Sequence, residues 1–326
     1  MPKSEIRKIG LLTSGGDAPG MNAAIRAIVR TSMHYNVRVT GIMRGFDGLL
    51  QGDITDLGSE DVSDIVHRGG TILRTARCAE MMTAEGQEKA ANICKILNLD
   101  ALFVIGGNGS IAGGLSLSKL GVNVICLPGT IDLDLDCSEY TIGFDTAVNT
   151  GMEAISKLKD TSSSHQRCSI IEVMGRYKGF IALWCGIVGG AEEVVVPEEE
   201  ATTNQNQVIE QILSNRSKGK MHNMIVVAEG IGDSAALAKK IEDATGIATR
   251  ATILGHLQRG GNPTAIDRMW ASTMGYEAVD IYLKGFKNRV LVVKDGVCAH
   301  LDVEEALEYK RPYDDKNYRM MKILAL

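Results

Sequence analysis

Short apolar runs alternate with longer amphipathic stretches along most of the chain. We predict strands over residues 9–13, 37–43, 101–105, 122–127, 169–173, 223–228 and 289–293. Helical patterns lie between most of them, for example at residues 21–34, 85–97 and 150–159. Such alternation is typical of parallel sheets that are covered by helices on both faces. The pattern therefore predicts an α/β fold whose ligands bind at the carboxyl ends of the strands.

Glycine-rich segments follow two of these strands. Residues 13–22 read Thr-Ser-Gly-Gly-Asp-Ala-Pro-Gly-Met-Asn, and residues 106–110 read Gly-Gly-Asn-Gly-Ser. Backbone N–H groups at a helix N-terminus attract an anion, and glycine permits its close approach. Neither segment matches GxGxxG or the P-loop pattern, so each alone is also compatible with a tight turn that binds nothing. Two of them at strand ends favour a nucleotide site.

A pair of carboxylates follows the next strand. Residues 129–134 read Gly-Thr-Ile-Asp-Leu-Asp. On an extended segment Asp132 and Asp134 would point the same way, so that one could bind a cation and the other could accept a proton. The alternative is a polar acidic loop, since Asp136 follows directly.

Two later clusters combine arginine, histidine and small residues. Residues 160–167 read Asp-Thr-Ser-Ser-Ser-His-Gln-Arg, and Met-Gly-Arg follows the next strand at residues 174–176. Arg250 precedes Gly-His-Leu-Gln-Arg-Gly-Gly at residues 255–261. The planar fork of arginine suits a phosphate group, whereas a serine run alone is compatible with a flexible loop. The remaining histidines are assigned structural roles: His34, His67, His222 and His300.

Composition narrows the class of protein. A chain of 326 residues favours two domains or one large α/β domain. The net charge of -5 argues against a general nucleic-acid binder, and the apolar runs are too short to span a bilayer. The N-terminal segment lacks the apolar region of a signal peptide. The 7 cysteines form no CxxC pair, so we expect buried thiols in a reducing cytoplasm rather than disulfides or a zinc site.

In combination, the motifs match a known family. The segments SGGDAPGMNAAIR, GTID, DTSSSHQR, VMGR and LGHLQRGGNP resemble bacterial ATP-dependent 6-phosphofructokinases, in order and over nearly the whole chain. The resemblance implies two α/β domains, each with a mainly parallel sheet between helices. It implies a larger ATP-binding domain of residues 1–143 and 256–307, and a smaller domain of residues 144–255 and 308–326 that binds fructose 6-phosphate. Composition does not mark this boundary.

The resemblance also implies a reaction. The family transfers the γ-phosphoryl group of ATP to the 1-hydroxyl of fructose 6-phosphate in glycolysis, with Mg²⁺. By this resemblance Asp132 matches the catalytic base, Thr130 lies in the same substrate loop, and Arg176 stabilises phosphate charge. The ATP-binding positions are Gly16, Arg77, Cys78, Gly107, Asn108, Gly109 and Ser110, and the Mg²⁺ positions are Asn108 and Asp134. The other sugar-phosphate positions are Arg167, Met174, Gly175, Glu229, Arg250, His256 and Arg259.

Regulation and assembly follow from the same resemblance. Arg167 and Arg250 match arginines that reach the sugar phosphate from a neighbouring subunit, which implies a homo-oligomer, usually a tetramer. The effector positions for ADP or phosphoenolpyruvate are Arg26, Arg30, Lys159, Gly190, Glu192, Lys218 and Lys220. Lys159 and Ser59 stand where the family has arginine, so we predict weakened or altered allostery. Gly109 and Gly129, in place of the Asp and Lys of diphosphate-dependent relatives, favour ATP as the donor.

Four departures surround the nucleotide and the metal. Asn108 stands where the family has Asp, Leu133 where it has Asn, Arg74 where it has a small residue, and Cys78 where it has an aromatic residue. Asn keeps an oxygen ligand but loses the charge that hard cations prefer. We hypothesise low activity, or a non-catalytic partner of an active paralogue that binds fructose 6-phosphate. Robust turnover of the purified protein with Mg²⁺, ATP and fructose 6-phosphate would refute this. A kinase with another donor or sugar phosphate, and a nucleotide-binding module of other chemistry, are further alternatives.

Overall fold

The computed structural model describes residues 7–199, 204–312 and 315–325, and these form two compact units. The first comprises the described residues up to Ile131, with Leu135–Asp145 and Arg259–Arg311. The second comprises Asp132–Asp134, the described part of Thr146–Gln258, and the described residues from Pro312 onward. Residues 1–6, on which the expectation about the N-terminal segment rests, lie outside the described residues, as do small parts of the expected domain ranges.

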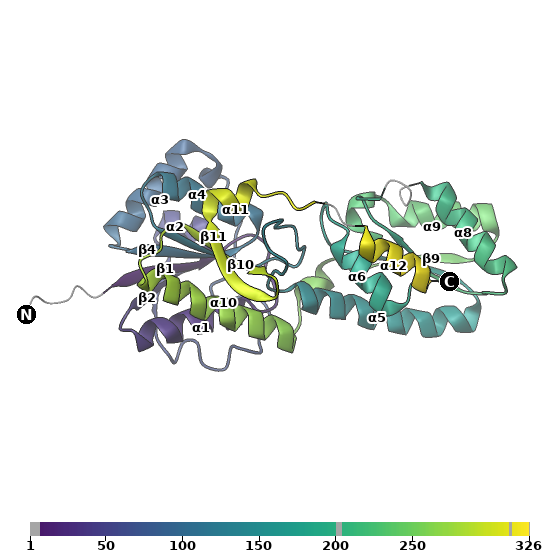
Figure 1. Cartoon of the computed structure of the whole chain (residues 1–326), viewed down its shortest axis with the longest axis horizontal. Helices are drawn as coiled ribbons and strands as arrows, with labels where there is room; N and C mark the ends of the chain where they lie inside the picture. Colours follow the sequence, from purple (N-terminus) through teal and green to yellow (C-terminus); the bar gives the residue numbers. More distant parts are fainter. Residues whose placement is uncertain (1–6, 200–203, 313–314, 326) are drawn as a thin grey trace, which may run out of the picture. The chain divides into compact units, whose positions relative to one another are not determined.

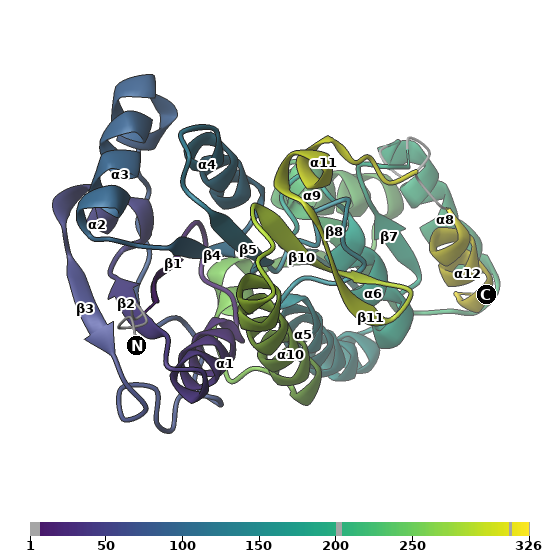
Figure 2. The same ribbon diagram turned by 60° about the vertical axis from the view of Figure 1, so that its left-hand side comes forward.

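A seven-stranded sheet forms the centre of the first unit. Its strands are β1 (Lys8–Thr13), β2 (Arg38–Ile42), β3 (Ile54–Leu57), β4 (Ala101–Gly106), β5 (Val124–Pro128), β10 (Arg289–Lys294) and β11 (Val297–Asp302). Their order is β11-β10-β5-β4-β1-β2-β3. Figure 1 shows this unit within the whole chain, and the order of its strands can be followed in Figure 2. The inner strands are parallel, whereas β3 and β11 are antiparallel to their neighbours at the two edges. The prediction of a mainly parallel sheet is confirmed.

Helices cover both faces of this sheet. The helices α1 (Met21–His34) and α10 (Ala265–Leu283) lie side by side on one face (Figure 2). The other face carries α2 (Gly45–Gln51), α3 (Ala84–Ile96), α4 (Asn108–Lys119) and α11 (Val303–Glu308), with the short helix η1 (Glu80–Met82) before α3. A buried apolar cluster joins the helices of this other face to the sheet. It includes Leu102 and Val124 of the strands and Ile111 of α4. Alternate positions of fully buried strands supply each layer.

A four-stranded parallel sheet forms the centre of the second unit. Its strands are β6 (Cys168–Val173), β7 (Glu193–Val195), β8 (Asn223–Ala228) and β9 (Thr249–Ile253), in the order β7-β8-β6-β9. The helices α8 (Gln205–Ser217) and α9 (Ser234–Thr245) pack on the face that includes Val195. The helix α6 (Phe180–Gly189) packs on the opposite face, where Gly186 lies directly against Val194. The remaining elements are α5 (Phe144–His165), η2 (Glu229–Ile231), η3 (Gly255–Arg259) and α12 (Lys316–Leu324).

One helix is longer than its sequence pattern suggested. The helix predicted over residues 150–159 is the middle of α5, which runs from Phe144 to His165. The serine run therefore lies in its last turns, and the alternative of a flexible loop is wrong. Ser162 is buried, and its hydroxyl donates to the carbonyl of Arg167 at 3.0 Å. This bond ties the helix end to the start of β6.

Most of the cysteines are buried in the two units. Of the 7 cysteines, Cys94, Cys126, Cys137, Cys168 and Cys185 are buried, as predicted. Burial in apolar surroundings raises the pKa of the Cys126 thiol to about 12, which keeps it protonated and unreactive. Among the described residues, no helix combines the length and the apolar character needed to cross a bilayer.

Candidate active site

The two glycine-rich segments of the first unit lie against each other. Strands β1 and β4 pair directly, with Thr13 opposite Ile105, and the Ser14 backbone N–H donates to the Ile105 carbonyl at 3.0 Å. A side chain at Gly106 would bring its Cβ to 2.5 Å from both the Ser14 carbonyl and the Ser110 hydroxyl. Only glycine fits there. Because the chain continues from β1 to β2 on one side and β4 lies on the other, these loops flank a switch point, where ligands bind in open α/β sheets.

The second of these segments is a strand end followed directly by a helix. Gly107 precedes α4 with no side-chain cap, and the helix starts at Asn108. The first N–H groups of a helix lack helical acceptors and carry partial positive charge. A Cβ at Gly109 would meet nothing within 4 Å, so the space above the helix start is open. Thr130 lies over Gly107, where a Cβ would be 3.4 Å from the Thr130 Cβ. The segment offers an anion a helix N-terminus with open access.

Arg259 lies over the first glycine-rich segment. Its guanidinium donates to the Asp17 carbonyl at 3.2 Å. A Cβ at Gly16 would be 2.4 Å from Arg259 Nη1, so any side chain at residue 16 would displace this arginine. The structure therefore brings together two residues that the sequence assigned to different ligands, Gly16 to ATP and Arg259 to the sugar phosphate.

The acidic segment after β5 is bent rather than extended. Thr130 and Asp132 are buried, Asp134 is half-buried, and Leu133 between the aspartates has a φ of 52°. The expectation that Asp132 and Asp134 share one direction on an extended segment is therefore wrong, because a left-handed residue between them breaks the alternation. Among the described residues, no three His, Cys, Asp or Glu side chains form a cluster able to hold a metal ion.

In the second unit, the predicted sugar-phosphate residues gather at the carboxyl ends of three adjacent strands. Met174, Gly175 and Arg176 follow β6, Glu229 follows β8, and His256 follows β9. Glu229 Oε1 accepts backbone hydrogen bonds from Arg176 at 2.7 Å and from Gly175 at 3.3 Å. This carboxylate fixes the turn in which Arg176 has a φ of 58° and an exposed side chain. The arginine is thereby presented at the edge of the sheet.

Sequence reasoning missed Gln258, whose side chain is fully buried between these loops. Its Oε1 accepts from the Met174 N–H at 2.7 Å, and its Nε2 donates to the Ala147 carbonyl at 3.1 Å. A buried amide with both ends bonded ties the turn after β6 to helix α5. The one sequence signal was its place between His256 and Arg259, two residues that the motif had already singled out.

Arg167 and Arg250 lie at the other edge of the same sheet. Arg167 directly precedes β6, and Arg250 is the second residue of β9, where it pairs with Glu242 at 3.1 Å. A strand of six residues spans about 20 Å, so this amino edge is far from Arg176. Within one chain, the structure does not bring these two arginines together with the residues at the carboxyl edge.

The predicted effector residues of the second unit also lie near its amino edge. Lys159 Nζ donates to the Gly190 carbonyl at 2.5 Å. Glu192, which is buried, pairs with Lys220 at 2.9 Å and accepts from the Met224 N–H at 2.5 Å. Lys218 ends α8 with an exposed side chain. Arg26 and Arg30 are one turn apart on α1, in the first unit.

The family pattern described as Phosphofructokinase matches residues 8–282. This chain belongs to the phosphofructokinase family. It is 53% identical over 320 residues to the ATP-dependent 6-phosphofructokinase of Clostridium botulinum (strain Hall), covering 98% of this chain and 100% of that protein. The ATP-dependent 6-phosphofructokinase of Clostridium acetobutylicum matches with the same identity and coverage.

A solved phosphofructokinase shares the fold. The structure of phosphofructokinase from Saccharomyces cerevisiae superposes with a TM-score of 0.84 and 34% sequence identity over 93% of this chain. This chain spans 45% of the yeast chain, which is therefore more than twice as long. Family membership thus rests on the sequence, and the yeast structure shares the fold.

Proposed function

We propose that this protein transfers the γ-phosphoryl group of ATP to the 1-hydroxyl of fructose 6-phosphate, giving fructose 1,6-bisphosphate and ADP in glycolysis. This is the ATP-dependent 6-phosphofructokinase reaction. The observation that carries the proposal is the pair of glycine-rich turns at the β1–β4 switch point, in a chain that belongs to the phosphofructokinase family over residues 8–282. The Clostridium relatives, which the chain matches over their whole length, bear the name of this activity.

The first unit is proposed to bind ATP. Its phosphates would lie over Gly16 and the start of α4, with Gly107, Asn108, Gly109 and Ser110 as the lining and with Arg77 and Cys78 beside it. Open space at Gly109 leaves room for a nucleotide. At Gly129 a Cβ would be 2.9 Å from Ile105 and 3.1 Å from Met21, so this site disfavours a lysine, the residue expected of a diphosphate-dependent relative. Both positions support ATP as the donor.

The Mg²⁺ that accompanies ATP requires few protein ligands. Mg²⁺ keeps several waters and binds through one or two protein oxygens together with substrate phosphates, so a cluster of three acidic residues is not needed. The Asn108 amide at the start of α4 and the half-buried Asp134 carboxylate are the oxygens that we assign to it. When bound, Mg²⁺ neutralises charge on the phosphates.

Asp132 is proposed as the catalytic base. Its carboxylate would take the proton of the sugar 1-hydroxyl while that oxygen bonds to the γ-phosphorus and the bond to the ADP oxygen breaks. Asp132 is 5% exposed, so its carboxylate is shielded from bulk water. Thr130 would orient the sugar, and Arg176 would stabilise the charge that develops on the transferring group.

The second unit is proposed to bind fructose 6-phosphate. Met174, Gly175, Arg176, Glu229 and His256 would contact the sugar from the carboxyl edge of the small sheet. Arg259 is proposed as a further ligand of the sugar phosphate. Arg167 and Arg250 lie at the opposite edge, so we propose that they serve the site of a neighbouring subunit in a homo-oligomer, most simply a tetramer. We propose a cytoplasmic location, which this glycolytic reaction supports.

The amino edge of the small sheet is proposed as an effector site for ADP or phosphoenolpyruvate. Lys159, Gly190, Glu192, Lys218 and Lys220 would line it. Lys159 is already bonded to the Gly190 carbonyl, and an ammonium lacks the paired donors of a guanidinium. We therefore expect a weakened or altered response. A sigmoidal fructose 6-phosphate curve that ADP relieves at ordinary potency would contradict this expectation.

A coupled assay tests the proposed function. Purified protein is given fructose 6-phosphate and Mg²⁺ with ATP, GTP or diphosphate as the donor. Turnover should be fastest with ATP, and fructose 1,6-bisphosphate should accumulate. Binding of fructose 6-phosphate without turnover with any donor would instead identify a regulatory partner. Preference for diphosphate would overturn the assignment of the donor.

A further inference from the structure

Residues 68–75, here called the strap, have no regular secondary structure. The strap runs from the turn at Gly261 to the first glycine-rich segment at Gly15. One buried side chain holds the first half of the strap. Asn22, in the first turn of α1, is 2% exposed. Its Nδ2 donates to the carbonyls of Arg68 and Gly69, both at 3.1 Å, and its Oδ1 accepts from the Ile72 N–H at 2.8 Å. Both polar atoms of this amide are thus hydrogen-bonded to the strap.

The second half of the strap is bonded to the first glycine-rich turn. The Thr13 hydroxyl donates to the Arg74 carbonyl at 2.7 Å, and the Thr75 hydroxyl donates to the Gly15 carbonyl at 2.6 Å. The strap also approaches the turn after η3, because a Cβ at Gly69 would be 2.2 Å from the Gly261 carbonyl. These contacts with the first glycine-rich segment and with the turn at Gly261 fix the position of the strap.

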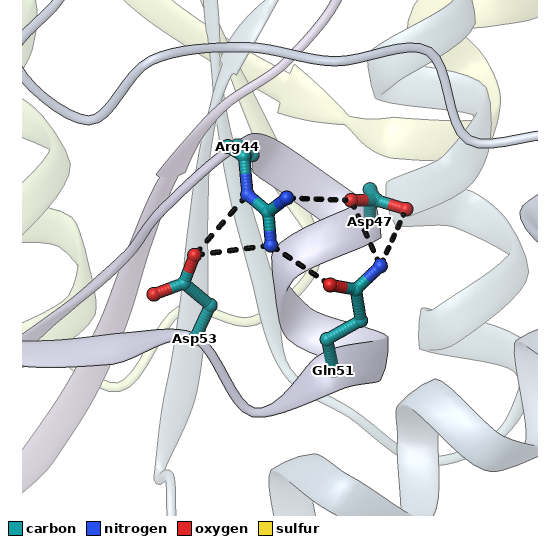
Figure 3. A network of polar contacts seen from close by, with 4 residues as sticks. All are labelled: Arg44, Asp47, Gln51 and Asp53. Carbon is teal, nitrogen blue, oxygen red and sulfur yellow. Dashed lines mark hydrogen bonds and ion pairs between the residues drawn. The ribbon is translucent and has the colours of Figure 1, made fainter.

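A fourth support comes from the neighbouring turn. The Arg44 N–H donates to the Leu73 carbonyl at 2.7 Å. Arg44 has a φ of 57°, and its guanidinium bonds to Asp53 at 3.1 Å and to Gln51 at 2.8 Å (Figure 3). Asp47 accepts from Gln51 at 3.1 Å and completes this network. The network holds the backbone that in turn holds Leu73.

Arg77 lies two residues after the end of the strap, and the backbone is held on both sides of it. Thr75 is bonded to Gly15 on one side, and Cys78 packs against the buried cluster of the sheet on the other. The Arg77 side chain itself is exposed. The strap therefore sets the position of the Arg77 backbone. The exposed guanidinium can contact a ligand bound at the glycine-rich segments.

We propose that Asn22 is a positioning residue for nucleotide binding, acting through the strap on Arg77. The inference rests on the proposed function, since it takes Arg77 as a ligand of ATP. Without the amide, three backbone groups of the strap lose their partners, and the strap samples other positions. Binding ATP must then also order the strap, so affinity for ATP falls while the sugar-phosphate site at the other unit is unaffected.

The test is a set of variants in the full chain. For Asn22→Ala we expect a rise of about tenfold or more in KM for ATP, from the lost hydrogen bonds, with KM for fructose 6-phosphate nearly unchanged. In an Arg77→Ala background the same change should have almost no further effect on KM for ATP, because the two residues act in series. Hydrogen exchange at the Ile72 amide should be faster in Asn22→Ala, and ATP should slow it in the unmodified protein.

Asn215→Ala is the matched control. Asn215 is also a buried amide, 6% exposed, and it donates to Asn223 at 2.9 Å within the second unit. This variant should lose stability without any change in KM for ATP. If Asn22→Ala does not fold, Asn22→Asp serves instead, since a carboxylate keeps the bond from Ile72 and loses both donors.

The outcomes separate this inference from the proposed function. No turnover by the unmodified protein with ATP and fructose 6-phosphate would remove the proposed function, and calorimetric titration with ATP would then test Asn22 directly. Normal turnover combined with an unchanged KM for ATP in Asn22→Ala, or fully additive effects with Arg77→Ala, would overturn the inference alone.

Discussion

The carboxyl ends of the two sheets offer different chemical groups to the ligands that we propose for them. In the large sheet, the loops after β1 and β4 consist of glycines and backbone groups packed so closely that Gly106 admits no side chain. In the small sheet, the turns after β6 and β8 present charged side chains, held by the carboxylate of Glu229. Backbone dipoles can approach a polyphosphate closely, whereas a sugar phosphate is bound by projecting arginine. The same kind of α/β sheet therefore offers closely packed backbone groups in one unit and projecting charged side chains in the other.

The largest expected effect is on the chemical step rather than on binding at either sheet. Asp132→Asn should lower kcat by about 10²–10⁴-fold, because the variant cannot accept the hydroxyl proton. Both KM values should change little. Asp136→Asn, in the same segment, is the control and should keep normal turnover in the coupled assay. A comparable loss in both variants would mean that the acidic segment acts through its overall charge rather than through one base.

The charged side of the comparison is tested by Arg250→Ala. Losing an arginine that bonds a phosphate should raise KM for fructose 6-phosphate by about 10–100-fold without affecting KM for ATP. Mixing this variant with Asp132→Asn and allowing subunits to exchange should give, at low fructose 6-phosphate, more activity in the coupled assay than either variant has alone. No recovery in verified mixed oligomers would argue that each site is built from a single chain.

Gln258→Glu tests whether the charges need a fixed support. The glutamate can still accept from the Met174 N–H, but it cannot donate to the Ala147 carbonyl. Losing this bond, which ties the turn after β6 to helix α5, should raise KM for fructose 6-phosphate by about tenfold. KM for ATP should stay constant, the reverse of the pattern expected for Asn22→Ala. If both variants raise both KM values equally, the two supports are not specific to their own ligands.

Asn108→Asp probes the metal site proposed for the first unit. A carboxylate at the start of α4 adds a charge that Mg²⁺ prefers, and it also suits the helix N-terminus. We expect the Mg²⁺ concentration for half-maximal rate to fall by severalfold, on the scale of one surface charge, about 1 kcal/mol. A Mg²⁺ titration at fixed ATP measures this. An unchanged curve would remove Asn108 from the metal site.

The smallest effect concerns Arg74, which has a φ of 59°. A left-handed backbone costs a residue with a Cβ roughly 1 kcal/mol, so Arg74→Gly should raise stability towards denaturant by about that amount. It should also raise KM for ATP by about two- to fivefold, the scale of one exposed charge pair. Asp295→Gly, at a φ of 52° in the hairpin between β10 and β11, should share any stabilisation without the change in KM. Equal KM values in both variants would show that Arg74 does not contact ATP.

Much of this architecture was predictable from local sequence. The helix at Met21–His34 and the strand at Asn223–Ala228 have the bounds that their apolar patterns predicted. The patterns were insufficient for α5, because serine and threonine have low helix propensity and packing overrides it. The edge strand β3 was missed because it has only four residues and its side chains are mostly exposed. Its position depends on pairing with β2 rather than on burial.

The candidate site was less predictable, for reasons of backbone geometry and register. Nothing in the letters Asp-Leu-Asp indicates that Leu133 is left-handed. The placement of Arg250 at the amino edge, near Arg167, follows from the pairing of Ser169 with Arg250. The supports provided by Gln258 and Asn22 depend on segments that are far apart in sequence, and their motif letters do not reveal the partners.

The order of the strands also has a consequence for synthesis. All four strands of the small sheet lie within residues 168–253, an uninterrupted stretch. The large sheet needs β10, which pairs with β5 across an interval of more than 150 residues, and then β11 at its edge. During synthesis on a ribosome, the second unit can therefore complete its sheet before the last strands of the first unit have been made. The first part of the chain to emerge belongs to the last sheet to close, and until then β5 remains an open edge that other chains could join.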